Sequence, residues 1–270
     1  KIPLDEIKNN PSALHNTQFK KEQRKLMLEG KRPAECDYCW KAEDSDKTGN
    51  TFSDRITKSS ETWALPDLDI IAKQSAEINT NPSYVEVSFS NVCNFKCSYC
   101  SPEVSSKWME EIKEHGAYPT STQFNNLSSV QKADKMPIPM KDSNPYVDAF
   151  WKWWPDLYPD LKVFRITGGE PLMAKDTFKV LDYIIENPNP NLELNINSNL
   201  CVPDKLLNEL IEKVNRINSE GLIKEFKLYT SCEAKGAKAE YIRNGLDYKK
   251  WYDNCHRILS EIHDSKLTNM

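Results

Sequence analysis

The chain has 270 residues, of which 39% are hydrophobic and 28% are charged, and its formal net charge is −4. That length is sufficient for one large α/β domain or two smaller ones. No apolar run approaches the ~20 residues that a membrane-spanning helix needs, and the sequence that begins at Lys1 does not resemble a signal peptide. We therefore expect a cytoplasmic protein without a membrane partner. The eight cysteines gather mainly in short motifs, which favours thiolate ligands in a reducing compartment over disulfides.

The first 80 residues are predicted to form an N-terminal accessory region. Residues 17–29 have the pattern of an amphipathic surface helix that ends at Gly30. Cys36 and Cys39 follow as a C-x2-C pair, and one pair cannot complete a zinc or iron–sulfur site by itself. Residues 44–80 are rich in Ser, Thr, Asp and Lys, so we expect an irregular linker there, with a helix near residues 54–60.

Residues 84–89 alternate apolar and polar side chains, which predicts a strand. Cys93, Cys97 and Cys100 follow it at C-x3-C-x2-C spacing on a short loop. Three thiolates leave one iron of a four-iron cluster without a protein ligand, and an open metal position is where small molecules bind and react. A zinc knuckle and buried structural thiols are the alternatives. Zinc needs a fourth protein ligand nearby, but the next His or Cys is His115.

The segment after the cysteines begins with a helix predicted over residues 104–115. Residues 116–146 then form a long insertion with several prolines, serines and asparagines. Loops of that length are usually functional or disordered, and both a substrate lid and a surface loop fit this one. Residues 146–158 contain three tryptophans, which we expect to pack a helix against a sheet rather than to stack on a nucleic-acid base.

Strand and helix patterns alternate in the remainder of the chain. A second strand from residue 163 ends at Gly168 and Gly169, which let the backbone turn sharply and approach a ligand closely. Helices are predicted over residues 177–187, 206–217 and 237–262, the last broken near 244–245, and two further strands over residues 192–197 and 226–231. This alternation predicts an α/β fold with parallel strands and crossover helices.

In such folds ligands gather at the carboxyl ends of the strands. The candidate residues share that position: the three cysteines, then the Gly168–Gly169–Glu170 turn, then Asn197 and Ser198, then Ser231 and Glu233. For Cys201, Cys232 and Cys255 we expect free thiols that are buried or partly buried.

The C-x3-C-x2-C loop, with Tyr99 directly before its last cysteine, and the Gly-Gly-Glu-Pro run that begins at Gly168 together resemble the radical SAM enzymes. The resemblance implies a partial (β/α)6 TIM-like barrel over residues 81–270, behind the accessory region 1–80. Four strands are visible in the sequence, so we expect that the last part of the barrel is missing at the C-terminus or that other elements close it.

In that family the three cysteines hold a [4Fe–4S] cluster whose fourth iron binds S-adenosylmethionine. The resemblance implies that Cys93, Cys97 and Cys100 ligate the catalytic cluster. It assigns the remaining candidates to parts of S-adenosylmethionine: Thr167, Gly168, Gly169 and Glu170 to the methionyl ammonium, Asn197, Ser198 and Arg243 to the methionyl carboxylate, and Ser231 and Glu233 to the ribose hydroxyls. Tyr99 matches the aromatic position of the cofactor loop. For Arg243, an ordinary surface-helix arginine is the alternative.

A narrower resemblance covers residues 28–33, Leu-Glu-Gly-Lys-Arg-Pro, which lead into the C-x2-C pair. Radical SAM proteins with a twitch or SPASM-like accessory domain carry a similar phrase and further cysteines. This resemblance implies an auxiliary iron–sulfur cluster with Cys36 and Cys39 among its ligands. A zinc knuckle or two free thiols are the alternatives.

Three functions follow as hypotheses. The first is a radical SAM enzyme that cleaves S-adenosylmethionine to a 5′-deoxyadenosyl radical, with an electron donor of the flavodoxin or ferredoxin type, and that acts on a peptide or protein side chain or another small molecule. The second is a radical SAM enzyme acting on a nucleoside or RNA, although the net charge and the lack of a basic stripe argue against a nucleic-acid partner. The third is a non-enzymatic zinc or iron–sulfur binding module.

Overall fold

The structure is a computed structural model that describes residues 2–45, 52–119, 121 and 126–262. The chain divides into two compact units, the first made of Lys1–Tyr84 and Pro145–Lys162, and the second of Val85–Asn144 and Val163–Met270. The first unit thus contains the predicted accessory region and also a segment from the middle of the chain. Among the described residues, no helix has both the length and the apolar character to cross a membrane.

The first unit is built from short helices. These are α1 (Leu4–Asn9), η1 (Pro11–Leu14), α2 (Gln18–Leu28), η2 (Ala34–Cys36), α3 (Asp37–Ser45), α4 (Asp54–Ser59), α5 (Leu65–Lys73), α8 (Pro145–Leu157) and η3 (Tyr158–Asp160). The helix predicted over residues 17–29 is confirmed as α2. Thr17 caps it by accepting a hydrogen bond from the Lys20 backbone N–H, and Gly30 ends it with a φ of 73°.

The predicted linker over residues 44–80 is only partly irregular. The helix expected near residues 54–60 is confirmed as α4, but the expectation of irregular chain is wrong for α5. Pro66 lies in the first turn of α5, where the missing N–H costs no helical hydrogen bond. The segment that follows α5 is fixed by Asn16, whose side-chain oxygen accepts a hydrogen bond from the Thr80 backbone N–H at 3.0 Å.

Helix α8 carries the aromatic cluster of the first unit. Phe150, Trp153 and Trp154 are buried, and the ring centroid of Trp154 lies 5.0 Å from that of Phe150 and 5.2 Å from that of Tyr158. The Trp153 indole N–H donates to the side-chain oxygen of Asn81 at 3.1 Å. Burial of these rings confirms that they pack in a core. Helix α8 packs against η1 and α1 of its own unit, and its packing against a sheet stays a prediction.

His15 lies in the turn between η1 and α2. Burial lowers the pKa of its imidazole to about 4, and the positive charges of Lys20 and Arg24 act in the same direction. The folded first unit therefore favours a neutral His15, whereas an unfolded chain protonates this side chain near its usual pKa.

We expect the free energy of unfolding to fall as the pH decreases from about 6.5 to about 4. Over this window His15 binds a proton in the unfolded chain but stays neutral in the folded protein. The loss is about 3 kcal/mol at most, since each pH unit is worth about 1.4 kcal/mol. Urea denaturation of the wild type and of His15→Gln across this range measures it. The variant should show a shallower fall, and equal slopes for the two proteins would contradict the assignment.

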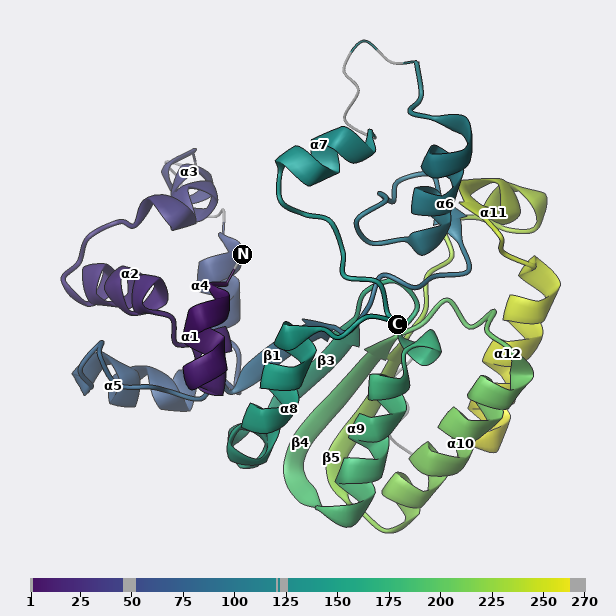
Figure 1. Ribbon diagram of the computed structural model, residues 1–270. Coiled ribbons are helices and arrows are strands. Elements are labelled where there is room, and N and C mark those ends of the chain that lie inside the picture. Colours follow the sequence, from purple (N-terminus) through teal and green to yellow (C-terminus); the bar gives the residue numbers. More distant parts are fainter. Residues whose placement is uncertain (1, 46–51, 120, 122–125, 263–270) are drawn as a thin grey trace. The chain divides into compact units, whose positions relative to one another are not determined.

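The second unit is organised around a four-stranded sheet with the strand order β1-β3-β4-β5 (Figure 1). The strands are β1 (Tyr84–Ser88), β3 (Val163–Thr167), β4 (Asn189–Asn197) and β5 (Ile223–Tyr229). The helical elements are α6 (Ser106–His115), α7 (Leu127–Lys132), η4 (Pro171–Met173), α9 (Lys175–Glu186), α10 (Asp204–Ser219), α11 (Ala237–Ile242) and α12 (Tyr248–Glu261). Strand β4 pairs in parallel with both β3 and β5, which confirms the predicted α/β class. The barrel stays a prediction.

The two faces of this sheet differ in chemistry because successive side chains point to opposite faces. Phe164, Leu194 and Phe226 stand in register and are buried on one face. Helix α10 contacts β5 and also packs against α9, as Figure 1 shows. The opposite face carries polar and charged side chains. The candidate residues lie at the carboxyl edge of the sheet, where the strands end.

A second, two-stranded sheet corrects the prediction for the end of the chain. The helix expected over residues 237–262 does break near residues 244–245, but a short strand stands in the break: β6 (Arg243–Asn244) pairs antiparallel with β2 (Lys96–Cys97). The insertion over residues 116–146 contains α7, and its residues 120 and 122–125 lie outside the described part of the chain.

Candidate functional site

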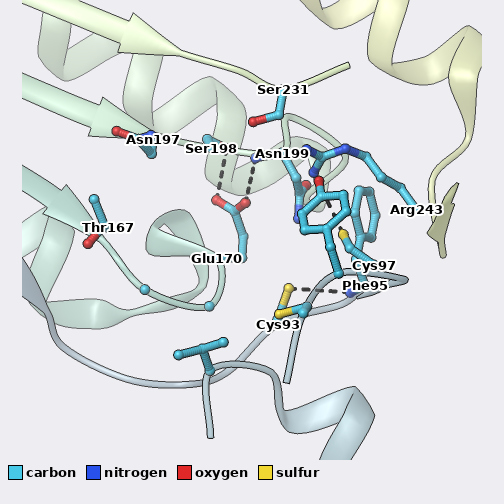
Figure 2. A pocket seen from close by; sticks show the side chains of 15 residues that line it. Cys93, Phe95, Cys97, Thr167, Glu170, Asn197, Ser198, Asn199, Ser231 and Arg243 are labelled. Atoms are coloured by element: carbon cyan, nitrogen blue, oxygen red, sulfur yellow. Dashed lines mark hydrogen bonds between the residues drawn. The ribbon is translucent and has the colours of Figure 1, made fainter. Parts of the chain in front are cut away.

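One cavity of about 240 Å³ lies in the second unit, where the cysteine loop meets the ends of the strands (Figure 2). Most of the residues predicted from the sequence line it. The full set of lining residues is Cys93, Phe95, Cys97, Tyr99, Cys100, Val104, Thr167, Gly168, Gly169, Glu170, Asn197, Ser198, Asn199, Ser231 and Arg243.

The start of α6 fixes the backbone of the cysteine loop. The Ser105 hydroxyl donates to the Phe95 carbonyl at 2.7 Å, and the same oxygen caps α6 by accepting from the Trp108 N–H. The Trp108 indole N–H in turn donates to the Cys97 carbonyl at 2.8 Å. These buried donors satisfy carbonyls that turn away from the regular ladder of a sheet, so the loop has one defined course.

Two further segments hold the same loop. Strand β6 pairs with β2, and the Ser98 N–H donates to the Ile242 carbonyl at 2.8 Å. From the end of β4, the Asn199 side-chain amide donates to the Asn94 side-chain oxygen at 2.8 Å. The Asn94 amide then donates to the Cys201 carbonyl at 2.9 Å.

The two glycines after β3 are required by close backbone approach. Gly168 has a φ of 120°, and a Cβ there would lie 2.3 Å from the Ser88 hydroxyl. A Cβ on Gly169 would lie 2.3 Å from the Val92 carbonyl oxygen. The Gly169 N–H donates to the Ser90 carbonyl and the Glu170 N–H to the Val92 carbonyl. The turn is therefore docked directly on the segment that leads into Cys93.

We expect Gly169→Ala to destabilise the second unit by about 2 kcal/mol or more, because its methyl group meets backbone atoms that cannot rotate away. The matched control is Gly221→Ala, at the end of α10, where a Cβ meets no atom within 4 Å. That change only places a side chain on a backbone in the left-handed conformation, which destabilises the fold by about 1 kcal/mol. Urea denaturation compares the two variants, and equal losses would contradict the docking of the turn.

The three thiols have different surroundings. Cys97 is buried, and the Arg243 Nη1 lies 3.7 Å from its Sγ. The Sγ of Cys93 accepts a long hydrogen bond from the Phe95 N–H at 3.4 Å. Burial raises the pKa of Cys93 to about 11 and raises the pKa values of Cys97 and Cys100, while the charge of Arg243 opposes the shift at Cys97.

In the described residues no three His, Cys, Asp or Glu side chains converge as a preformed metal-binding group. The thiols of Cys93, Cys97 and Cys100 thus share the wall of one cavity without meeting at one point. Figure 2 shows Cys93 and Cys97 on the loop, across the cavity from Glu170.

Glu170 joins the ends of β3 and β4. Its side chain is only 1% exposed, and its carboxylate accepts hydrogen bonds from the Ser198 hydroxyl at 2.8 Å, the Asn199 N–H at 2.7 Å and the Leu172 N–H at 3.0 Å. Burial raises its pKa to about 6, and these three donors limit the rise. Ser198 was predicted to face a ligand, but its hydroxyl donates its hydrogen bond to Glu170.

Arg243 is 8% exposed and lies on β6, so the alternative of a surface-helix arginine is wrong. Its guanidinium grips the Glu233 carboxylate with Nε and Nη2, the former at 2.7 Å. The Tyr99 hydroxyl donates to the same carboxylate at 2.7 Å, and the Arg243 guanidinium carbon lies 5.4 Å from the Tyr99 ring centroid. The hydrogen bond from Arg243 lowers the pKa of Glu233 to about 2.

The remaining predicted residues are placed as follows. Thr167 lines the cavity and donates from its hydroxyl to Glu86 at 3.2 Å. Asn197 lines it and accepts from Arg165 Nε at 3.0 Å. Ser231 lines it and is exposed. Glu233 is outside the lining set and reaches the cavity through Arg243 and Tyr99.

Sequence reasoning missed three lining residues: Phe95, Val104 and Asn199. Asn199 belongs to the polar run Asn197-Ser198-Asn199 that follows β4, and that run was the available signal. Phe95 is buried inside the cysteine loop. Its apolar side chain carries no signal for a site, because buried aromatics are usually core.

The cysteines outside this loop are all free. Cys36 and Cys39, in η2 and α3 of the first unit, are half-buried, and the auxiliary cluster stays a prediction. Cys201 and Cys255 are partly buried as expected. Cys232 is exposed, so its predicted burial is wrong, because the chain that follows β5 runs on the surface there.

No protein-family model, no curated protein and no solved structure matches this chain.

Proposed function

We propose that this protein is a cytoplasmic radical SAM enzyme that binds a [4Fe–4S] cluster through Cys93, Cys97 and Cys100. The observation that carries the proposal is the shared cavity. The three thiols and the Gly168–Gly169 turn, more than 60 positions apart in the sequence, line one space at the carboxyl edge of a parallel sheet.

The donor set fits such a cluster. Three cysteines and no histidine line the cavity. The soft ligands that it offers to a metal centre are therefore the three thiolates, all from one loop. Arg243, beside Cys97 Sγ, favours the thiolate form that ligation requires. Phe95 and Val104 add apolar surface to the wall, which reduces access of water to the sulfurs.

The chain's own groups suit the binding of S-adenosylmethionine beside those thiols. The backbone carbonyls near Gly168 and the Glu170 Oε2, which accepts one hydrogen bond from the Asn199 N–H in the described residues, supply acceptors for an ammonium group. Ser198 and the Asn199 N–H hold that carboxylate in place. Tyr99 also lines the cavity, and its hydroxyl donates to Glu233, which fixes the ring.

A cluster held by Cys93, Cys97 and Cys100 would supply the one electron that cleaves the C5′–S bond of S-adenosylmethionine, which would give methionine and a 5′-deoxyadenosyl radical able to take a hydrogen atom from the substrate. A flavodoxin- or ferredoxin-type protein is the proposed electron donor, and a peptide or protein side chain is the proposed substrate. The docked glycine turn and the hydrogen-bonded loop keep the reacting groups in one geometry.

Anaerobic reconstitution with iron and sulfide, followed by dithionite and S-adenosylmethionine, tests the proposal. We expect 5′-deoxyadenosine and methionine in equal amounts. Cys97→Ala should lose about four irons relative to the wild type and should form no 5′-deoxyadenosine.

Cys255→Ala is the matched control, because this partly buried cysteine lies outside the cavity, and it should keep both the iron and the product. One zinc per chain without iron would overturn the proposal in favour of a binding module. Continued turnover in Cys97→Ala would overturn the assignment of the catalytic cluster to these three cysteines.

A further inference from the structure

Arg165 on β3 is held in place but has hydrogen-bonding capacity to spare. Its Nε donates to the Asn197 side-chain oxygen at 3.0 Å, its guanidinium carbon lies 5.2 Å from the Tyr229 ring centroid, and Glu86 is no closer than 3.9 Å. Among the described residues, the two terminal nitrogens Nη1 and Nη2 have no hydrogen-bond partner. The side chain is 31% exposed. A guanidinium fork in this state suits a carboxylate.

Its neighbour Asn195 has a side-chain oxygen that accepts no hydrogen bond in the part of the chain that the structure describes. Asn195 is the register partner of Arg165 on β4, about 5 Å away across the sheet, and it is only 4% exposed. Its side-chain amide donates to Glu193 at 3.0 Å, and within the described chain its Oδ1 has no hydrogen-bond partner. Exchanging the amide nitrogen and oxygen would turn the oxygen toward the Glu193 carboxylate, so the orientation is fixed.

The other cation of this row is already neutralised. Lys227 pairs in register with Asn195 from the β5 side, and its ammonium contacts Glu193 at 2.9 Å and Glu225 at 3.3 Å. Arg165 is therefore the cation of the row Arg165–Asn195–Lys227 that remains available to a ligand. The nearby carboxylates make the face as a whole slightly acidic, which disfavours a doubly charged anion such as phosphate.

We propose that Arg165 and Asn195 form a substrate subsite for a carboxylate that carries an N–H donor close by, as at the end of a peptide chain or in an N-acylated amino acid. The carboxylate pairs with Nη1 and Nη2 of Arg165, and the N–H donates to Asn195 Oδ1. The inference rests on the proposed function in that this ligand is the substrate of the reaction at the cavity.

The subsite adjoins the cavity through two residues. Asn197, which orients Arg165, lines the cavity, and so does Thr167, two positions after Arg165 on the same strand. Side chains two positions apart on a strand lie on the same face of the sheet. Arg165 and Asn195 therefore share a face with Thr167 and Asn197, which line the cavity beside the thiols. A substrate anchored there extends toward the cavity.

Titration of the full chain with N-acetylglycine, followed by the NMR signal of the Arg165 Nε–H, tests the inference. The signal is assigned by its disappearance in Arg165→Lys. We expect a saturable shift with N-acetylglycine, a weaker response to acetate, which lacks the N–H donor, and the weakest response to inorganic phosphate.

In the variants, binding is followed by the N-acetylglycine signals instead. Arg165→Gln should bind about tenfold to a hundredfold more weakly, the loss expected for a charge-assisted pair, and Asn195→Leu several-fold more weakly. The matched control is Arg216→Gln on α10, where an exposed arginine paired with Glu220 is removed, and it should bind like the wild type.

Absence of a saturable shift, unchanged binding in Arg165→Gln, or tighter binding of phosphate than of N-acetylglycine would overturn the inference. Its failure is separable from that of the proposed function, because the titration needs neither cluster nor reductant. Formation of 5′-deoxyadenosine without probe binding removes the subsite alone, and probe binding without S-adenosylmethionine cleavage removes the proposed reaction alone.

Discussion

Hydrogen bonds from neighbouring helices, strands and turns hold the backbone of the cysteine loop in place. Ser105, which caps α6, and Trp108 of α6 donate to its carbonyls. Strand β6 pairs with its short strand, and the glycine turn after β3 docks on its first residues. An irregular loop in a protein interior must satisfy its backbone groups through such contacts. The course of the loop that carries the three sulfurs is therefore set by contacts with α6, β6 and the turn after β3.

Two carboxylates with opposite pKa shifts flank that cavity. Burial raises the pKa of Glu170 to about 6, although three hydrogen bonds tie it to the ends of β3 and β4. The guanidinium of Arg243 lowers the pKa of Glu233 to about 2. The first carboxylate thus fixes the strand ends, and the second fixes the arginine beside Cys97. Glu170 lines the cavity itself, whereas Glu233 acts on it through Arg243 and Tyr99, which do line it.

Local patterns predicted most of this unit, because period-2 alternation, the cysteine spacing and the paired glycines each act within ten residues. They placed all four strands of the main sheet and most of the cavity wall. They could not place Arg243, whose burial depends on a two-residue strand that pairs far across the chain. They also missed α5, whose apolar side chains are largely exposed, and the grouping of residues 145–162 with the first unit. The burial of Arg243 and the grouping of residues 145–162 arise from tertiary contacts rather than from local propensity.

The separation of Cys97 and Arg243 by 146 positions affects biosynthesis. At synthesis rates of roughly 5–20 residues per second, the arginine leaves the ribosome on the order of ten seconds after the thiol. During that interval the nascent chain presents its three thiols beside an incomplete wall, open to stray metal ions and oxidants. Protection of the nascent thiols during translation is therefore a separate requirement from the stability of the finished fold.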